Sequence, residues 1–322
     1  MNPLKISVLG CGRWGTFLAW YACNMGHEVY LWGRENSINF AELAKDRSNE
    51  YLTLQAGVNL THSLTEAVAF GEFIIIAISA QHLREFAKQI SLLKSAKKAF
   101  ILCMKGLEVE SGKRLSQVFA EELGSNSNVA IWVGPGHVQD FLKGIPNCMV
   151  IGSNGIELTK NIVENLGSDL IRFYYGQDLI GNEVGAAAKN VIGIAAGMLD
   201  GLGYSSLKGA LMARGAREVA RLVRAMGGNE LTVYGLSHLG DYEATLFSSY
   251  SHNRRFGELY VKGDRFEKLA EGVATVQALK YLSDRHEVDL PICNAVHSIV
   301  SEGKNPAEIL VNLFVRPIRF EF

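Results

Sequence analysis

Lys189 is the single charged residue in a long run of small and apolar side chains, residues 184–199. An ammonium group in such a run must reach solvent, pair with an opposite charge or face a cavity, because burial without a partner is costly. We expect a cavity, since desolvation there lowers the pKa of an amine and lets it donate and accept a proton near neutral pH. Lys189 is therefore a candidate general acid and base.

A second lysine and a glycine-rich turn follow two apolar runs that have the pattern of strands. Lys105 comes after residues 100–103, and the turn at residues 134–136 comes after residues 129–133. The carboxyl ends of parallel strands line the binding crevice of a doubly wound sheet, so Lys105 can reach a cofactor or a bound oxyanion there. The open amides of the turn suit an anion, although a plain turn explains the glycines equally well.

Residues 10–15 read GCGRWG, with the spacing GxGxxG, and lie between the first apolar run and a helical pattern. In this motif the first glycine permits a tight turn, the second lets the backbone approach a pyrophosphate, and the third allows close helix packing. Phosphate oxygens then meet the positive end of the helix. Any tight strand-to-helix turn favours glycine, but the position near the N-terminus predicts dinucleotide binding.

Arg34 and Glu35 follow the second apolar run, residues 28–32, where the chain meets the ribose of a bound dinucleotide. An acidic residue there bonds the 2′-hydroxyl of NAD, and an arginine can hold the 2′-phosphate of NADP in a bidentate pair. Arg34 stands near the expected position, and the alternative is a solvated arginine after a strand. The cofactor thus stays open between NAD and NADP, with Arg34 favouring NADPH.

Two polar segments of the second half contain residues that suit a lysine and a phosphate. Asp241 follows a glycine, and ten residues later come Ser251, Asn253 and two arginines. The aspartate can orient a lysine, and the later group can bind a phosphate. Equally, the first segment can be a helix cap and the second a basic helix end. No cysteine or histidine stands at ligand spacing from His238 or Asp241, so we predict no metal site.

The elements that must position these residues alternate through the first half of the chain. Short, nearly continuous apolar strands separated by helical patterns, such as residues 14–25, are typical of a parallel sheet covered on both faces. Right-handed crossovers give a doubly wound sheet, which we place at residues 1–180. The expected strands are residues 5–10, 28–32, 73–78, 100–103, 129–133 and 148–151.

From Glu183 onward the pattern becomes helical. Residues 183–201 are rich in Ala and Gly, residues 206–226 have the pattern of a second long helix, and no strand of comparable quality follows Phe173. The small side chains of the first helix predict close packing on all its sides. The expected fold class is therefore α/β, with an all-helical second domain at residues 181–322.

Composition excludes several classes of function. The 322 residues carry 32 Lys and Arg against 33 Asp and Glu, and this net charge of −1 argues against nucleic-acid binding through bulk charge. The five cysteines are scattered without a CxxC pair, as expected for buried thiols in a reducing compartment. The longest strongly apolar run, residues 73–80, is too short to span a bilayer, and no signal peptide is evident. We predict a soluble cytoplasmic protein without membrane insertion.

Eight segments taken together resemble the bacterial NAD(P)-dependent glycerol-3-phosphate dehydrogenase family, over nearly the whole chain. The resemblance implies an N-terminal Rossmann domain and a helical C-terminal domain. It also implies a homodimer formed through the helical domain. The segments occur in one order: Gly10–Thr16, Lys105–Gly106, Gly134–Pro135, Ala188–Val191, Met212–Gly215, Gly240–Asp241, Ser251–Gly257 and Ala270–Gly272.

The activity that the resemblance implies is reversible hydride transfer between NAD(P)H and dihydroxyacetone phosphate. The product, sn-glycerol 3-phosphate, is the backbone precursor of phospholipids. By similarity, Lys189 is the proton donor and acceptor at the carbonyl oxygen, Lys105 lies beside it and polarises the carbonyl, and Asp241 holds the lysine. A cationic donor at a developing alkoxide stabilises charge that exists mainly in the transition state, and the nicotinamide supplies the hydride.

The resemblance also assigns contacts residue by residue. The expected cofactor contacts are Gly10, Gly12, Arg13, Trp14, Gly15, Arg34, Lys105, Val138 and Glu271. The expected contacts with the small phosphorylated substrate are Lys105, Gly134, Lys189, Asp241, Ser251, His252 and Asn253.

Three departures from the family fall around the expected binding crevice. His252 replaces an arginine that contacts phosphate, and a histidine offers fewer donors and only partial charge near neutral pH. Arg254 or Arg255 are the candidates to compensate, but neighbouring residues on a helix point about 100° apart. The loop at residues 203–208 is shorter and lacks an asparagine. Residues 134–138 lack the hydroxyl side chain that the family has near the cofactor.

Two alternatives to this dehydrogenase remain. One is an NAD(P)-binding sensor that keeps the dinucleotide pocket without efficient turnover. The other is a diverged dehydrogenase that acts on a different 2-oxo or 2-hydroxy compound. The presence of Lys189, Lys105 and Asp241 together favours an enzyme, because a sensor does not need all three.

Overall fold

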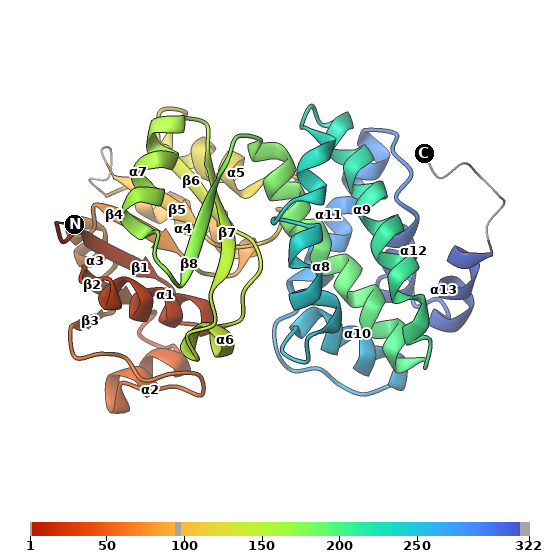
Figure 1. The fold of residues 1–322 in the computed structure, drawn as a ribbon, viewed down its shortest axis with the longest axis horizontal. Helices are drawn as coiled ribbons and strands as arrows, with labels where there is room; N and C mark the ends of the chain where they lie inside the picture. Colours follow the sequence, from red (N-terminus) through yellow and green to blue (C-terminus); the bar gives the residue numbers. More distant parts are fainter. Residues whose placement is uncertain (1, 94–97, 316–322) are drawn as a thin grey trace. The chain divides into compact units, whose positions relative to one another are not determined.

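The computed structural model describes residues 2–93 and 98–315, which form two compact units. The sheet unit comprises the described parts of residues 1–105 and 113–179. The helical unit comprises the described parts of residues 106–112 and 180–322. In Figure 1 the strands of the sheet unit run from red to green, and the helices of the helical unit run from green to blue.

Across the described residues the sheet has eight strands in the order β3-β2-β1-β4-β5-β6-β7-β8. Every neighbouring pair is parallel except β6 and β7, which are antiparallel. The strands are β1 (Lys5–Leu9), β2 (Glu28–Trp32), β3 (Val58–Thr61), β4 (Phe73–Ile76), β5 (Ala99–Leu102), β6 (Asn128–Val133), β7 (Asn147–Ser153) and β8 (Ile171–Gly176).

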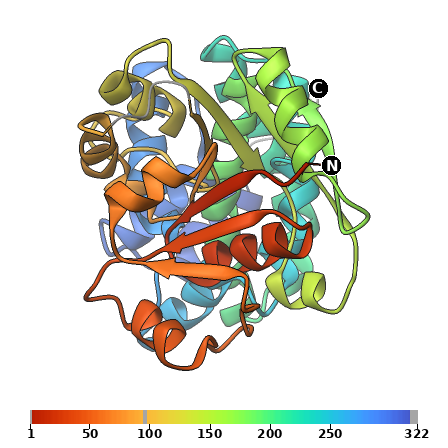
Figure 2. The same ribbon diagram turned by 90° about the vertical axis from the view of Figure 1, so that its left-hand side faces the viewer.

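Helices cover both faces of this sheet. Ile6 and Val8 of β1 join an apolar core that includes residues of α1, whereas Ser7, on the opposite face, donates a hydrogen bond of 2.6 Å to the Ala67 carbonyl of α3. Figure 2 shows α1 beside β1 and β2. The helices of this unit are α1 (Arg13–Asn24), α2 (Ile38–Asp46), α3 (Leu64–Phe70), η1 (Ala80–His82), α4 (Leu83–Ser91), α5 (Leu115–Leu123), α6 (Val138–Leu142) and α7 (Ile156–Leu166).

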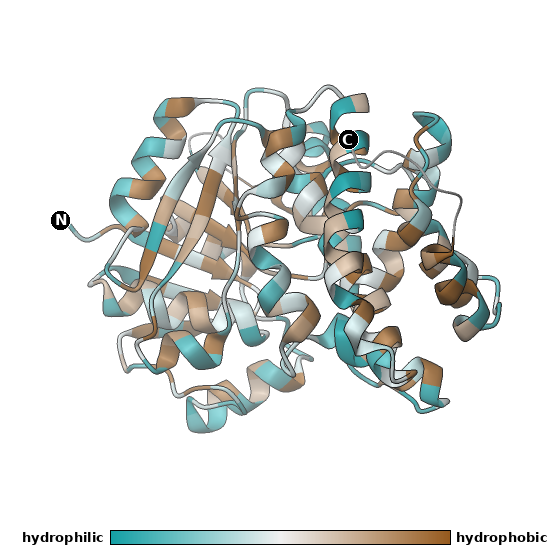
Figure 3. Ribbon diagram, turned by 45° about the vertical axis from the view of Figure 1, so that its right-hand side comes forward, coloured by the Kyte–Doolittle hydropathy of each residue, from teal (hydrophilic) through white to brown (hydrophobic). Residues whose placement is uncertain are grey.

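The helical unit surrounds one long helix, α8. Its elements are α8 (Leu179–Gly201), η2 (Ser205–Leu207), α9 (Lys208–Ala225), η3 (Glu230–Tyr234), η4 (Leu239–Asp241), η5 (Glu243–Phe247), α10 (His252–Lys262), α11 (Glu271–Arg285), α12 (Pro291–Val300) and α13 (Pro306–Phe314). Hydrophilic and hydrophobic residues alternate along most of these ribbons, as expected for helices covered on one side (Figure 3).

The expected close packing of α8 is confirmed. Every residue from 181 to 199 is buried. A Cβ on Gly197 would lie 1.8 Å from the Arg254 carbonyl oxygen, and one on Gly257 would lie 2.1 Å from the Ile194 carbonyl oxygen. The backbones of α8 and α10 therefore meet directly, which no side chain larger than glycine allows at these two points.

The sheet differs from the sequence prediction in three ways. β3 and β8 are not among the predicted strands, and both are the outermost strands of the sheet, where one face or edge meets solvent. Such strands lack the continuous apolar run used to find the inner ones, and residues of β8 alternate between buried and exposed. The predicted all-parallel sheet is also wrong at β7, which runs antiparallel to β6.

Residues 106–112 are assigned to the first domain by the sequence pattern, but they pack within the helical unit. Leu107 is fully buried in the core of that unit, and a Cβ on Gly112 would lie 2.7 Å from the Tyr281 ring of α11. The chain therefore enters the helical unit once before it returns to the sheet unit for α5. Within the described residues, no helix is long and apolar enough to cross a membrane.

Candidate active site

The glycine motif forms the turn from β1 into α1, and its three glycines meet different surroundings. Gly10 has a φ of +119°, and a Cβ there would lie 2.3 Å from the Ala77 carbonyl oxygen. A Cβ on Gly15 would lie 1.8 Å from the Gly10 carbonyl oxygen. Gly12 stands at the N-cap of α1 without a side-chain cap, and no heavy atom lies within 4 Å of the Cβ that it lacks. The first and third glycines serve packing, and the second leaves the helix N-terminus open.

This open N-terminus fits the pyrophosphate of a dinucleotide. The first amides of a helix have no partner within the helix, and the helix dipole is positive there. The first turn of α1 carries no acidic residue that would repel an anion. Arg13, the first residue of the helix, lies with its guanidinium 5.8 Å from the centre of the Tyr51 ring. The residues present in the sheet unit therefore suit a nicotinamide dinucleotide.

Two other residues expected to contact the cofactor, Trp14 and Val138, pack in the core of the sheet unit. Trp14 packs on Phe17 and Phe141, with ring centres 5.1 and 6.3 Å apart. Val138, the first residue of α6, is 2% exposed.

Burial raises the pKa of the Cys11 thiol, which follows Gly10 in the turn, so this cysteine stays a neutral thiol at physiological pH.

Arg34 and Glu35 follow β2, and both are exposed. The adjoining Gly33 is buried, and a Cβ there would lie 2.6 Å from the Cys11 sulfur, so this glycine holds the end of β2 against the glycine turn. Both side chains are thus accessible at the carboxyl end of the strand next to β1.

Lys105 and Gly134 are brought together in the sheet unit. The Lys105 ammonium donates a hydrogen bond of 2.6 Å to the Gly134 carbonyl oxygen. They follow the neighbouring parallel strands β5 and β6, so both lie at the carboxyl edge of the sheet that also carries Gly10. Gly134 has a φ of +130°, a conformation that favours glycine.

In the helical unit, Lys189 of α8 forms a buried cluster with Asp241 and Thr245. Its ammonium lies 3.0 Å from the Asp241 carboxylate and donates a hydrogen bond of 2.6 Å to the Thr245 hydroxyl. Lys189 is 5% exposed, and the other two side chains are each 2% exposed. Of the three settings considered for this lysine, the structure shows pairing with an opposite charge.

Thr245 is not among the residues singled out from the sequence. It lies in η5, a single π-helical turn that directly follows Asp241 and Tyr242. A Cβ on Gly193 would lie 2.7 Å from the Thr245 methyl group, so α8 approaches η5 closely one turn beyond Lys189. Nothing in the local sequence marks Thr245, because its contact with Lys189 spans 56 residues.

Asn253 and Glu271 lie near the same part of α8. The side-chain oxygen of Asn253 accepts a hydrogen bond of 2.9 Å from the backbone N–H of Gly272, which adjoins Glu271 at the start of α11. A Cβ on Gly272 would lie 2.8 Å from the carbonyl oxygen of Asn190, the residue after Lys189. The N-terminal ends of α10 and α11 therefore meet at the lysine-bearing turn.

Ser251 and His252 begin α10. Ser251 is its N-cap, and its hydroxyl accepts a hydrogen bond of 3.3 Å from the Arg254 backbone N–H. The His252 ring lies 3.1 Å from the Leu269 carbonyl oxygen through Nδ1 and meets the Phe266 ring edge-on at 5.8 Å. These contacts place the ring against the segment that leads into α11.

The two arginines that could compensate for His252 are engaged in ion pairs. Arg254 lies 2.7 Å from Asp200 at the end of α8 and 3.5 Å from Glu258. Arg255 is exposed and lies 3.2 Å from Glu258. Replacement of the family arginine by a neighbour would therefore break existing pairs.

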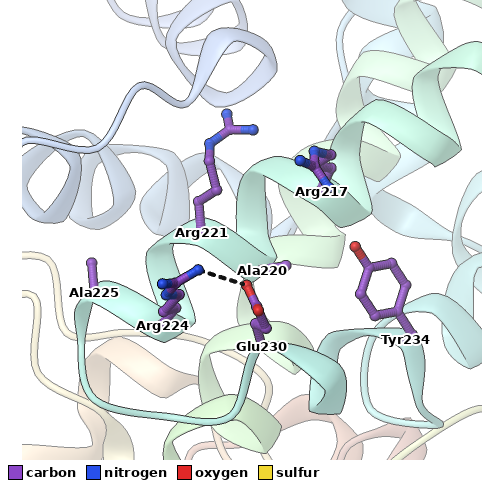
Figure 4. A pocket seen from close by; sticks show the side chains of 7 residues that line it. All are labelled: Arg217, Ala220, Arg221, Arg224, Ala225, Glu230 and Tyr234. Atoms are coloured by element: carbon purple, nitrogen blue, oxygen red, sulfur yellow. Dashed lines mark ion pairs between the residues drawn. The ribbon is translucent and has the colours of Figure 1, made fainter. Parts of the chain in front are cut away.

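A cavity of about 480 Å³ lies elsewhere on the helical unit and contains none of the candidate residues. In Figure 4, Arg217, Arg221 and Arg224 of α9 approach it together with Tyr234. Arg221 donates a hydrogen bond of 2.7 Å to the Asp289 carbonyl oxygen, and Arg224 lies 3.8 Å from Glu230. Among the residues that the structure describes, no three His, Cys, Asp or Glu side chains are grouped to hold a metal.

Comparison with known proteins decides the family. A model described as the N-terminus of NAD-dependent glycerol-3-phosphate dehydrogenase matches residues 5–159, and the corresponding C-terminal model matches residues 178–311. A glycerol-3-phosphate dehydrogenase [NAD(P)+] of Thermoanaerobacter sp. (strain X514) is 34% identical and aligns over 99% of each chain. The chain belongs to the NAD-dependent glycerol-3-phosphate dehydrogenase family.

Other members of this dehydrogenase family show the same full-length similarity. The relative from Prosthecochloris aestuarii (strain DSM 271 / SK 413) is 35% identical, over 97% of this chain and 98% of its own. The crystal structure of glycerol-3-phosphate dehydrogenase from Coxiella burnetii aligns with a TM-score of 0.90 and 28% identity, over 98% of this chain and 99% of that one. The resemblance read from the sequence, and the predicted α/β fold with a helical second domain, are confirmed.

Proposed function

We propose that this protein reversibly reduces dihydroxyacetone phosphate to sn-glycerol 3-phosphate with NADH or NADPH. The observation that carries this proposal is the buried Lys189–Asp241 pair, with Nζ and carboxylate oxygen 3.0 Å apart. Full-length similarity to glycerol-3-phosphate dehydrogenases supports it independently. A nicotinamide dinucleotide, when bound, supplies or accepts the hydride.

The residues of the sheet unit bind and orient the dinucleotide in this proposal. The amides of the first turn of α1, left open at Gly12, receive the pyrophosphate, and Arg34 pairs with a 2′-phosphate where one is present. The exposed Arg34 guanidinium supports a preference for NADPH, because a 2′-phosphate gains a charge-assisted bond that a 2′-hydroxyl does not. The remaining proposed contacts are Gly10, Arg13, Trp14, Gly15, Lys105, Val138 and Glu271.

Lys189 holds the proton that the substrate carbonyl oxygen receives. Its ammonium donates that proton as the oxygen becomes an alkoxide, and takes it back in the reverse direction. Asp241 supplies the opposite charge that holds the ammonium in place, and the Thr245 hydroxyl accepts a second N–H. Two fixed partners restrict the direction in which the ammonium points, which serves proton transfer along a defined line.

Lys105 and the remaining contacts bind the polar groups of the substrate. The Gly134 carbonyl anchors the Lys105 ammonium, which polarises the carbonyl group of the substrate. The Asn253 side-chain oxygen is used by Gly272 N–H, so the amide NH2 end is the side that donates to substrate. Gly134, Ser251 and His252 complete the proposed substrate contacts.

The test is oxidation of NADH and NADPH, in parallel, by purified protein with dihydroxyacetone phosphate. Loss of nicotinamide absorbance supports the enzyme and its substrate, and the ratio of the two rates measures the cofactor preference. Cofactor binding without oxidation would overturn the proposal.

A diverged dehydrogenase acting on another 2-oxo compound is the second candidate. The contacts of His252 with Leu269 and Phe266 favour it, because they hold the residue that replaces the family arginine against a neighbouring segment. Oxidation of NADH or NADPH with other 2-oxo acids or esters, but not with dihydroxyacetone phosphate, would select this alternative. Cofactor binding with no oxidation by either class would select a sensor.

We also propose that the protein is a cytoplasmic homodimer. Both the cytoplasmic location and the dimer rest on the resemblance to the bacterial glycerol-3-phosphate dehydrogenase family. Sedimentation of the purified protein measures the dimer directly.

A further inference from the structure

His238 is a fully buried histidine that joins two elements of the helical unit. Its Nδ1 lies 2.7 Å from the Gly185 carbonyl oxygen of α8, and its Nε2 lies 2.7 Å from the Tyr242 hydroxyl. A carbonyl oxygen only accepts, so Nδ1 carries the hydrogen, and in the neutral ring Nε2 accepts from Tyr242. Each ring nitrogen thus has one partner, and the tautomer is fixed.

The two elements that His238 joins are the ones that carry Lys189 and Asp241. Gly185 lies one helical turn before Lys189 on α8, so both residues lie on the same face of that helix. On the other side, the Asp241 backbone N–H donates a hydrogen bond of 3.0 Å to the His238 carbonyl oxygen, and Tyr242 is the next residue. The imidazole therefore links the backbone of the turn before Lys189 to the side chain of the residue that follows Asp241.

The approach of the ring to α8 is close. A Cβ on Gly185 would lie 3.0 Å from the His238 Cβ, so a larger residue at position 185 would push the ring away from the helix. Both His238 and Tyr242 are 0% exposed, so water does not compete for their hydrogen bonds.

We propose that His238 is a positioning residue: its bridge from the Gly185 carbonyl to the Tyr242 hydroxyl sets the distance and direction between the Lys189 ammonium and the Asp241 carboxylate. The inference rests on the proposed function, in which Lys189 transfers the proton. A displacement of Gly185 relative to Tyr242 would move the turn that carries Lys189 relative to the residue that follows Asp241.

The ring does this without adding charge to the site. Burial is the largest cause that lowers the pKa of His238, and the Lys189 charge adds to it. The hydrogen bond to Gly185 and the Asp241 charge oppose both, and the resulting pKa is about 4. Burial, together with the Glu218 charge from α9, raises the pKa of Tyr242 well above its usual range. Near neutral pH the bridge is therefore a neutral imidazole and a neutral phenol, and it does not compete with Lys189 for the carboxylate.

The experiment compares four variants of the full chain. His238→Leu removes both hydrogen bonds, His238→Asn keeps a donor toward Gly185, and Tyr242→Phe removes only the phenol hydroxyl. Ser237→Ala is the matched control, because Ser237 is the adjacent residue, is 1% exposed, and its hydroxyl has no hydrogen-bond partner. Thermal unfolding verifies that each variant folds, and the Asn and Phe variants carry the test if the Leu variant does not fold.

We expect His238→Leu to lower kcat between about tenfold and a hundredfold, the usual cost of losing a group that orients a functional residue. Cofactor affinity should stay within about twofold of wild type, and the pH at which kcat is half-maximal should move, because the Asp241 carboxylate is no longer held at its distance from the lysine. His238→Asn should recover part of kcat, and Ser237→Ala should match wild type. Equal kcat and pH profiles in His238→Leu and Ser237→Ala would overturn the proposal.

A second readout separates this inference from the proposed function. The Lys189 side-chain signal in carbon-13 NMR, assigned by its loss in Lys189→Met, reports the setting of the ammonium without turnover. We expect its titration midpoint to move in His238→Leu and Tyr242→Phe but not in Ser237→Ala. If wild type oxidises no cofactor with dihydroxyacetone phosphate, the proposed function fails. The NMR signal still tests whether His238 positions Lys189, because it does not depend on turnover. An unmoved signal in His238→Leu would refute the bridge even in an active enzyme.

Discussion

The lysine ammonium at position 189 is the group on which the proposed proton transfer depends. Lys189→Ala should lower kcat by about 10²- to 10⁴-fold, the usual contribution of a positioned acid or base. NADPH affinity should remain nearly intact, because the glycine turn proposed to receive the dinucleotide is in the sheet unit. Stopped-flow oxidation and fluorescence titration of NADPH measure the two quantities. Unchanged turnover would remove the mechanism.

Two glycines of one motif allow a matched pair of substitutions. Gly15→Ala places a Cβ 1.8 Å from the Gly10 carbonyl oxygen, so the free energy of unfolding should fall by about 1–3 kcal/mol, as in overpacked cores.

Gly12→Ala meets open space and a φ of −76°, so stability should change by less than about 0.5 kcal/mol. Its methyl group would fill part of the space proposed for the pyrophosphate, and NADPH affinity should fall. Urea titration and cofactor titration of the two variants separate the effects. A loss of stability in Gly12→Ala equal to that in Gly15→Ala would contradict this division.

His252→Arg tests the departure from the family at the start of α10. An arginine brings a permanent charge and a bidentate fork, so the KM for dihydroxyacetone phosphate should fall if the phosphate binds there. Arg255→His, on the exposed neighbouring position, is the control and should leave KM unchanged. An unchanged KM or lost activity in His252→Arg would show that His252 belongs to a rebuilt site.

Among single residues, the sequence predicts glycines that a tight turn requires and a charged residue that stands alone in an apolar run. The glycine motif and Lys189 stand out because their types conflict with ordinary local preferences. Thr245 and the His238–Tyr242 bridge did not stand out, because a threonine and a tyrosine are common in a helical unit. Only the fold brings Thr245 to Lys189, across 56 residues of sequence.

Among the elements, α12 is held at its N-terminus by a buried carboxyl group from α9. Glu218 accepts hydrogen bonds of 2.8 and 3.0 Å from the backbone N–H groups of Ile292 and Cys293. Burial raises its pKa from 4.5 to about 7, although these bonds lower it. The folded state therefore binds this proton more tightly than the unfolded state does.

This shift predicts a pH dependence of stability. The contribution of Glu218 is fully present below about pH 4.5 and is lost as the pH rises through about 7, a total of about 3 kcal/mol. Glu218→Gln, which cannot ionise, should remove that part of the slope in the unfolding free energy. Urea titrations of both proteins across this range measure it. Identical slopes would show that the carboxyl group does not titrate in the folded state.

The sequence predicts the inner strands of the sheet but not its two outermost strands. Inner strands such as β4, FIII, are apolar on both faces and were found, whereas the outermost strands β3 and β8 were not. The direction of β7 is not encoded in its own residues, because an antiparallel and a parallel strand bury the same alternating side chains.

At the scale of the whole molecule, the division into two units predicts how the protein responds to its cofactor. Saturating NADPH at a hundred times its Kd should stabilise the state that binds it by about 2.7 kcal/mol. Amide hydrogen exchange should therefore slow in α1 of the sheet unit and much less in α12 of the helical unit. Equal slowing in both would show that the two units unfold as one.

The short segment 106–112 has a consequence for dissecting this protein. Because Leu107 completes the helical core although it lies between two parts of the sheet unit in sequence, a cut at residue 180 does not yield two self-sufficient fragments. The C-terminal fragment would start with a leucine-sized void, worth about 2–5 kcal/mol of its stability. The N-terminal fragment would expose Leu107, which is fully buried in the whole chain. A peptide of residues 106–112 added to the C-terminal fragment is the natural complement.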